Sequence, residues 1–443
     1  MFRKYTRQNI RYVKQLGSNY VQMLANYLIF FFLTPLMLNN LGQEQYGLWL
    51  LLSTVILYFS LSNFGLATSF GVHLPKVKDN KLETDKLLNT VLFTLLCISV
   101  VASLFFLLLE YHIGFFLNIS DKYKTTAQIS LLFFFLTFLV TLLGSIFDNI
   151  LVATNHLLTK NVIETLKTIL IGVMSIVLVK YNTSIVPIAV SNFVFTLLFF
   201  FITFYSCKKV IRYKVNFRMF DKKVLKNLFI PSIHYFLMGI ASLLVFYSDN
   251  ILISRLKGVE YIGLFAITYR LSDVCTKVLT KISVTKYPKV ILLSSQQDYR
   301  GILKLHNRLL LVNIAVTLPV CLVLFFFGKD ILVLWLGAKY QYNVAILRIF
   351  SIFTFFMVCA QNTGTFIGGL GIHKRFAYMG MAEAFLNVGL SYLFFQYFDL
   401  TGIALGTLCA HLLTNGWFGY FEFYRFILRK LQSSKHDLAM SLN

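Results

Sequence analysis

Hydrophobic segments of about 20 residues recur along the whole chain, and each is long enough to cross a bilayer as a helix. They run from Gly17 to Tyr424, and apolar stretches such as 28–33 and 131–136 are nearly continuous. Strands of a membrane barrel would instead alternate in blocks of about ten residues. The pattern therefore predicts an all-α polytopic membrane protein with twelve transmembrane helices. The predicted spans are 17–38, 47–69, 88–109, 126–151, 162–179, 185–206, 228–252, 262–283, 309–327, 343–366, 377–397 and 401–424.

Composition supports this class, because 57% of the 443 residues are hydrophobic and only 13% are charged. Six cysteines are scattered singly, and the eight histidines show no metal-ligand spacing. We therefore predict neither a metal site nor a cofactor. The first apolar segment is too long for a cleavable signal and is expected to remain as the first helix.

The net charge of +23 comes from 41 Lys and Arg residues against 18 Asp and Glu. With both termini in the cytoplasm, 29 of these 41 cations lie on the inner side and 7 on the outer side. That asymmetry predicts cytoplasmic termini. The cations flank the spans, where topology and anionic head groups account for them, so we expect contact with membrane lipids and no nucleic-acid partner.

Two stretches of the chain repeat each other. Residues 42–49 and 258–265 share a Gly, Glu and Gly pattern at an offset of 216, and Glu164 matches Glu383 at an offset of 219. Residues 188–189 match 403–404 at an offset of 215. The repeat predicts two parallel six-helix bundles around a central cavity, an architecture suited to alternating access. The expected divisions are 1–206 (first bundle), 207–227 (basic cytoplasmic linker), 228–424 (second bundle) and 425–443 (cytoplasmic tail).

The eighth predicted span carries four charges on one side. Arg270, Asp273, Lys277 and Lys281 fall within an arc of roughly 80° on a helix. A charge at the bilayer centre costs about 2.5 to 3.5 kcal/mol, so this stripe is expected to face a bundle interior or an aqueous cavity.

Other charges within predicted spans are the cations Lys167 and Arg348 and the acids Glu164, Asp249 and Glu383. Asp148 and Glu422 sit near span ends and count for less. We expect the cations to line the same cavity and the acids, with Asp273, to be candidates for ion coupling, because a buried carboxylate can change protonation during transport. An alternative interpretation gives these charges a structural role only, in which Glu164 pairs with Lys167 and Asp273 pairs with Arg270 or Lys277. Lys281 could also snorkel to the cytoplasmic head groups.

Several motifs, in order along nearly the whole chain, resemble the polysaccharide repeat-unit flippases (Wzx-type, O-antigen or capsule translocases) of the multidrug/oligosaccharidyl-lipid/polysaccharide exporter superfamily. They are Leu41 to Trp49, Phe59 to Leu66, Tyr247 to Gly258, Leu334 to Gly337 and Gly369 to Lys374. Asn63 departs from the family pattern, in which an acidic residue often stands there.

The resemblance implies transport, without catalysis, of an undecaprenyl-pyrophosphate-linked oligosaccharide from the inner to the outer leaflet of a bacterial inner membrane. Coupling to a proton or sodium gradient and contact with other polysaccharide-assembly proteins are further expectations. Cations in the path would compensate the pyrophosphate, since dry burial of an anion is very costly. The alternatives are a multidrug/cation antiporter of the same superfamily, a flippase for peptidoglycan precursor, and a membrane-bound polysaccharide polymerase. Short outer loops disfavour the polymerase.

Overall fold

A computed structural model describes most of the chain, and its described part contains helices and no strands. The described residues are 2–77, 79–111, 119–154, 156–181, 184–211, 213–340 and 342–440. The chain forms two compact units, and each of them contains part of helix α9 (Lys222–Leu256). Unit 1 comprises Met1–Gly239 and Ile253–Gly263, and unit 2 comprises Ile240–Leu252 and Leu264–Asn443. The predicted linker 207–227 and the boundaries beside it stay a prediction.

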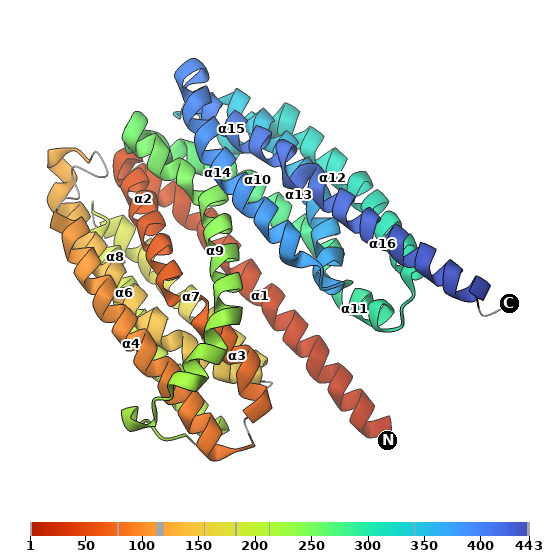
Figure 1. Cartoon of the computed structure of the whole chain (residues 1–443). Helices are drawn as coiled ribbons and strands as arrows, with labels where there is room; N and C mark the ends of the chain where they lie inside the picture. Colours follow the sequence, from red (N-terminus) through yellow and green to blue (C-terminus); the bar gives the residue numbers. More distant parts are fainter. Residues whose placement is uncertain are drawn as a thin grey trace. The chain divides into compact units, whose positions relative to one another are not determined.

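Unit 1 is a bundle of long helices, in which α6 packs along both α4 and α8, and α7 packs along α1 (Figure 1). Its interior holds a ring cluster in which Phe106 stacks on Phe135 at 4.0 Å between centroids. Its helices, besides the ends of α9, are α1 (Phe2–Asn40), α2 (Gly42–Ser60), α3 (Leu66–Val77), α4 (Lys81–Tyr111), α6 (Asp121–Ala153), α7 (Leu157–Tyr181) and α8 (Val186–Val210).

Unit 2 is a second bundle, in which α14 packs closely along α15 and α12 along α13. Two of its helices start after a side-chain cap: Asp298 accepts from the backbone N–H of Gly301 before the helix 299–336, and Asn343 accepts from that of Ala345 before the helix 344–369. Its helices, besides the middle of α9, are α10 (Glu260–Val284, whose first turn belongs to unit 1), α11 (Tyr287–Ser295), α12 (Tyr299–Leu336), α13 (Val344–Gly369), α14 (His373–Phe398), α15 (Leu400–Leu413) and α16 (Asn415–Met440).

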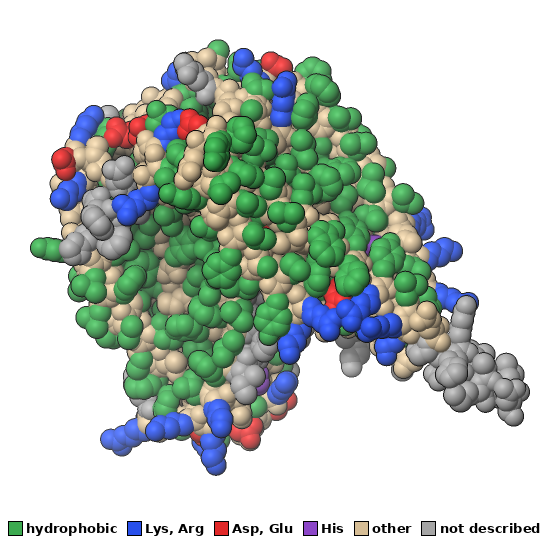
Figure 2. All heavy atoms as spheres, turned by 45° about the horizontal axis from the view of Figure 1, so that its top comes forward, with side chains coloured by type: hydrophobic (Ala, Val, Ile, Leu, Met, Phe, Trp, Pro, Cys, Tyr) green, Lys and Arg blue, Asp and Glu red, His purple; other side chains and the backbone are tan. Residues whose placement is uncertain are grey.

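Nine helical segments within the described residues are long and apolar enough to cross a membrane. Large apolar side chains point outward along them, among them Leu311 at 67% and Phe326 at 63% exposure. Figure 2 shows broad hydrophobic areas with Lys and Arg at their margins. An outer surface of this kind suits lipid, because water would favour polar side chains there. The polytopic all-α class is confirmed. The count of twelve stays a prediction, because the α10, α14, α15 and α16 segments are too charged, too polar or too short for the same criterion.

Two predicted spans are interrupted. The span 47–69 is divided by a 3₁₀ turn, Leu61–Asn63, after which Phe64 and Gly65 both take positive φ. The Asn63 side chain stabilises this turn by accepting from the Gly65 N–H at 2.6 Å. The span 401–424 is divided at Thr414, between α15 and α16. Both interruptions place irregular backbone within long apolar stretches. The backbone N–H and C=O groups there need hydrogen-bond partners from the protein or from water, because lipid supplies none.

The repeated glycine motif forms a contact within unit 1. A Cβ added at Gly47 would meet the backbone of Val259, and one added at Gly263 would lie 3.0 Å from the Tyr46 ring and 3.6 Å from the Gln43 carbonyl. Gln43 and Gly47 stand 216 residues before Val259 and Gly263, so the two contacts are equivalent under the repeat. The start of α2 and the start of α10 therefore pack through matching glycines.

Candidate functional site

The charged stripe on α10 is centred on one carboxylate that two cations share. Arg270 Nη1 donates to Asp273 Oδ2 at 3.0 Å, and Lys277 Nζ donates to the same oxygen at 2.9 Å. The Asp273 side chain is 10% exposed, whereas those of Arg270 and Lys277 are 33% and 49% exposed. Both pairings that the helix spacing allows therefore form together, and both cationic side chains stay partly exposed.

Lys281 extends the stripe by one turn and makes no ion pair among the residues that the structure describes. The four residues together carry three positive charges and one negative charge. The helix therefore presents a positive excess even after its internal pairs have formed.

Arg348 lies on α13, where its guanidinium sits 5.2 Å from the centroid of the Phe325 ring. Two residues later, Phe350 packs against Tyr269 of α10 at 5.2 Å. Residues two apart point to nearly opposite sides of a helix, so Arg348 faces away from α10. The structure does not bring Arg348 together with the α10 stripe.

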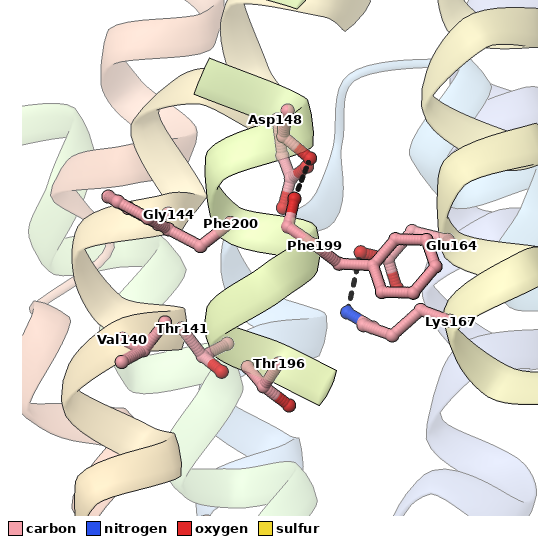
Figure 3. A pocket seen from close by; sticks show the side chains of 10 residues that line it. Val140, Thr141, Gly144, Asp148, Glu164, Lys167, Thr196, Phe199 and Phe200 are labelled. Atoms are coloured by element: carbon pink, nitrogen blue, oxygen red, sulfur yellow. Dashed lines mark hydrogen bonds and ion pairs between the residues drawn. The ribbon is translucent and has the colours of Figure 1, made fainter. Parts of the chain in front are cut away.

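A small pocket in unit 1 holds the second group of predicted charges. Lys167 Nζ donates to Glu164 Oε1 at 2.7 Å, and both side chains are 21% exposed. Figure 3 shows this pair on α7 beside the pocket, with Asp148 of α6 at its upper end. The pocket has a volume of about 30 Å³, which is room for one or two waters and far too little for a sugar. Lys167 thus pairs with Glu164 in a pocket that Asp148 also lines.

Asp249 on α9 is buried in unit 2 at 7% exposure. Its Oδ2 accepts from the Thr407 hydroxyl of α15 at 3.2 Å, and its Oδ1 has no partner among the described residues. Ser248 and Asn387, beside it, form a weak bond of 3.5 Å. A buried carboxylate with one neutral donor can take up a proton or a small cation far more readily than one that is already paired.

Glu383 on α14 is buried at 5% exposure and contacts two polar side chains. Its Oε1 lies 2.8 Å from His411 Nδ1, and its Oε2 accepts from Asn415 Nδ2 at 2.6 Å. These three residues line a cavity of about 140 Å³ within unit 2. Glu383 therefore shares no ion pair with a Lys or Arg in the described part of the chain.

His411 and Asn415 were missed by the sequence analysis, which treated the histidines as dispersed. The signal was present in two polar stripes at four-residue spacing, which places their members on one helix face. The stripes are Glu383, Asn387 and Ser391 on α14, and Thr407, His411 and Asn415 on α15 and α16. Asp148 was also undervalued, since the structure puts it beside Glu164 and Lys167.

The sequence matches one protein family and is similar to proteins from bacteria. The family described as polysaccharide biosynthesis protein matches residues 36–345. The chain is 22% identical over 369 residues to a Shigella flexneri protein named as an O-antigen transporter, covering 83% of this chain and 87% of that protein. It is 20% identical over 431 residues to a Yersinia pseudotuberculosis protein named as an O-antigen export protein, covering 95% and 98% respectively.

Solved structures of similar fold are membrane transporters. A multidrug resistance transporter of the MATE family, in an inward-facing conformation, aligns with a TM-score of 0.78 at 13% identity, over 95% of this chain and 99% of that one. The lipid II flippase MurJ aligns with a TM-score of 0.75 at 18% identity, over 94% and 91%. At these identities the likeness is one of fold, and it confirms the predicted all-helical, multi-pass class.

Proposed function

The chain belongs to the polysaccharide biosynthesis protein family, and from that premise we propose that it is a flippase for a lipid-linked oligosaccharide. The substrate is an oligosaccharide repeat unit on undecaprenyl pyrophosphate, moved from the inner to the outer leaflet of a bacterial inner membrane. Both termini lie in the cytoplasm. The protein performs no covalent chemistry, and its work is to lower the barrier that the bilayer core imposes on a polar head group.

The positive excess on α10 carries this proposal. Arg270, Lys277 and Lys281 outnumber Asp273 on this stripe, and the side chains of Arg270 and Lys277 stay partly exposed after pairing. A pyrophosphate is a multiply charged anion that guanidinium and ammonium groups recognise well. The sugar and pyrophosphate then follow a hydrated path past these cations while the prenyl tail remains in lipid. Arg348 and Lys167 play a lesser part in this proposal. Arg348 lies on a face of α13 that points away from α10, and Lys167 is paired with Glu164.

The four acidic candidates for ion coupling differ in their surroundings. Glu164 and Asp273 each have a Lys or Arg within 3.0 Å, whereas the described partners of Asp249 and Glu383 are hydroxyl, amide or histidine groups. A carboxylate that already has a permanent cation gains little from a second one. We therefore assign coupling to a proton or sodium gradient to Asp249 and Glu383 ahead of Glu164 and Asp273.

A multidrug/cation antiporter is the second candidate, favoured by the fold shared with a MATE transporter. The α10 stripe weighs against it, because a positive surface repels the cationic drugs that such an exporter carries. A deletion experiment separates the two candidates. Loss of the protein should leave lipid-linked oligosaccharide on the inner leaflet and remove surface polysaccharide, without a change in drug sensitivity. An unchanged lipid-linked pool with increased drug sensitivity would favour the antiporter.

A further inference from the structure

One carboxylate bridges the break between α15 and α16. Thr414 ends α15 with φ −125° and ψ −105°, and α16 begins at the next residue. His411 lies in the last turn of α15, and Asn415 is the first residue of α16. Glu383 holds both through its two oxygens, at 2.8 Å and 2.6 Å. The two helix ends are thus joined through a side chain of α14.

The helix ends set up opposite electrostatic preferences at this point. The amino end of a helix carries a partial positive charge and favours a carboxylate, whereas the carboxyl end favours a cation. Glu383 lies at the amino end of α16, through Asn415, and His411 lies at the carboxyl end of α15. The carboxylate therefore lies at the helix end that attracts negative charge, and the imidazole lies at the helix end that attracts positive charge.

Two acceptor atoms at this site have no partner. An ionised carboxylate only accepts hydrogen bonds, so Nδ1 of a neutral His411 carries the proton and Nε2 is left as a bare acceptor. Asn415 gives its amide N–H to Glu383, which leaves its Oδ1 free. His411 Nε2 and Asn415 Oδ1 are both buried and find no hydrogen-bond partner in the described part of the chain. The His411 side chain itself is only 2% exposed.

The described side chains that line the surrounding cavity carry no competing charge. With a volume of about 140 Å³ it has room for several waters, which can bring a proton to His411. Among the described residues that line it, only Glu383 and His411 titrate. The other described lining residues are apolar or uncharged, and the polar ones among them are Ser242 of α9, Gln361 of α13 and Asn415 of α16. The next acid that faces α15 is Asp249, which bonds to Thr407 one turn before His411.

We propose that the Glu383, His411 and Asn415 cluster is a proton-binding site built into the break between α15 and α16. A hydronium ion in the cavity gives its proton to the lone pair of His411 Nε2, so an N–H bond forms, an O–H bond breaks and a water molecule remains. The cluster changes from one net negative charge to a neutral imidazolium and carboxylate pair. The stronger attraction between His411 and Glu383 draws the carboxylate from Asn415, and the joint between the two helix ends shifts. The site requires no lipid-linked substrate and is testable on the purified protein alone.

The chain supplies an optical reporter and a control for this site. The Trp417 indole N–H donates to the Leu413 carbonyl at 3.1 Å, a bond that spans the break. A protein with Phe at the other two Trp positions reports on this bond alone. His306 is the matched control, because it is equally buried in unit 2 but both of its ring nitrogens have partners, at 3.0 Å and 3.1 Å.

The experiment follows Trp417 emission of the purified full chain from about pH 5 to pH 9, the range that brackets ordinary histidine titration. We expect a pH-dependent emission shift that His306→Gln retains and His411→Gln abolishes. Glu383→Gln should abolish or displace it. The same shift in His411→Gln, or no shift in the parent protein, would overturn the proposal.

A second measurement keeps the test decisive if His411→Gln folds poorly. Nitrogen-15 NMR of the eight labelled histidines follows each Nε2 directly through the same titration. We expect one buried histidine to gain a proton at Nε2 as the pH falls, with its titration displaced in Glu383→Gln and unchanged in His306→Gln. If no buried histidine responds to Glu383→Gln, the site does not bind a proton as proposed.

Discussion

Removing the two accessible cations of α10 tests whether they serve the substrate or only neutralise Asp273. The double variant Arg270→Gln, Lys277→Gln lowers the charge of the stripe from two positive to zero, because Lys281 and Asp273 then cancel. A hydrogen bond to a charged group is worth about 1.5 to 3 kcal/mol. Because these two side chains are 33% and 49% exposed, solvent screening reduces each contribution to about 1 kcal/mol. The pair should therefore contribute about 2 kcal/mol, or roughly 30-fold in affinity for a pyrophosphate lipid.

The assay measures the Kd of the purified protein in nanodiscs for undecaprenyl diphosphate. We expect the double variant to bind about 30-fold more weakly. Arg375→Gln is the matched control, since Arg375 is a 59% exposed cation of the same unit that pairs with Glu422. It should bind within about twofold of the wild type, as an exposed surface pair contributes little.

A triple variant that also carries Asp273→Asn distinguishes the two roles. If the cations bind the pyrophosphate, removal of Asp273 leaves the affinity weak, because the lost contacts are not replaced. If the cations exist only to neutralise Asp273, the triple variant regains the wild-type Kd. Recovery to within about twofold of the wild type would refute the assignment of Arg270 and Lys277 to the substrate.

Further predictions concern the pocket of unit 1, the packing of α14 on α15, and the coupling acid. Lys167→Gln should lower thermal stability in detergent by about 1 kcal/mol, because it leaves Glu164 unpaired beside another acid, and adding Glu164→Gln should restore it; no recovery contradicts the pairing. Gly406→Ala should cost about 1 to 3 kcal/mol, since its Cβ would meet the backbone of α14, whereas Gly389→Ala, whose Cβ meets nothing within 4 Å, should cost nothing by the same melting assay. Asp249→Asn should leave the Kd for undecaprenyl diphosphate unchanged but remove the dependence of flipping on an ion gradient; gradient-driven flipping in this variant would exclude Asp249 as the coupling acid.

Much of the helical framework could be predicted, because long apolar runs have few alternatives to a spanning helix. The boundaries follow local chemistry that is visible in the sequence, as at Asn343, where the predicted start coincides with a side-chain cap. The spacing of Arg270, Asp273 and Lys277 likewise anticipated their pairing, since a helix places residues three and four apart side by side.

The interruptions within spans could not be predicted from hydrophobicity. Neither Phe64 nor Thr414 is a helix breaker by composition, and each interruption depends on tertiary partners. Phe64 takes positive φ while its ring packs on Phe236 at 4.9 Å, and the break at Thr414 is stabilised by Glu383 from another helix. The same limit hid the role of His411, whose chemistry depends on a carboxylate 28 residues away.

The most direct test of the central claim is transbilayer movement of a fluorescent, undecaprenyl-diphosphate-linked oligosaccharide in liposomes that contain the purified protein. A membrane-impermeant quencher reports the fraction of label on the outer leaflet over time. We predict that label confined to one leaflet reaches the other in liposomes with the wild-type protein, and much more slowly in those with Arg270→Gln, Lys277→Gln or with no protein. Equal rates in all three preparations would contradict the account.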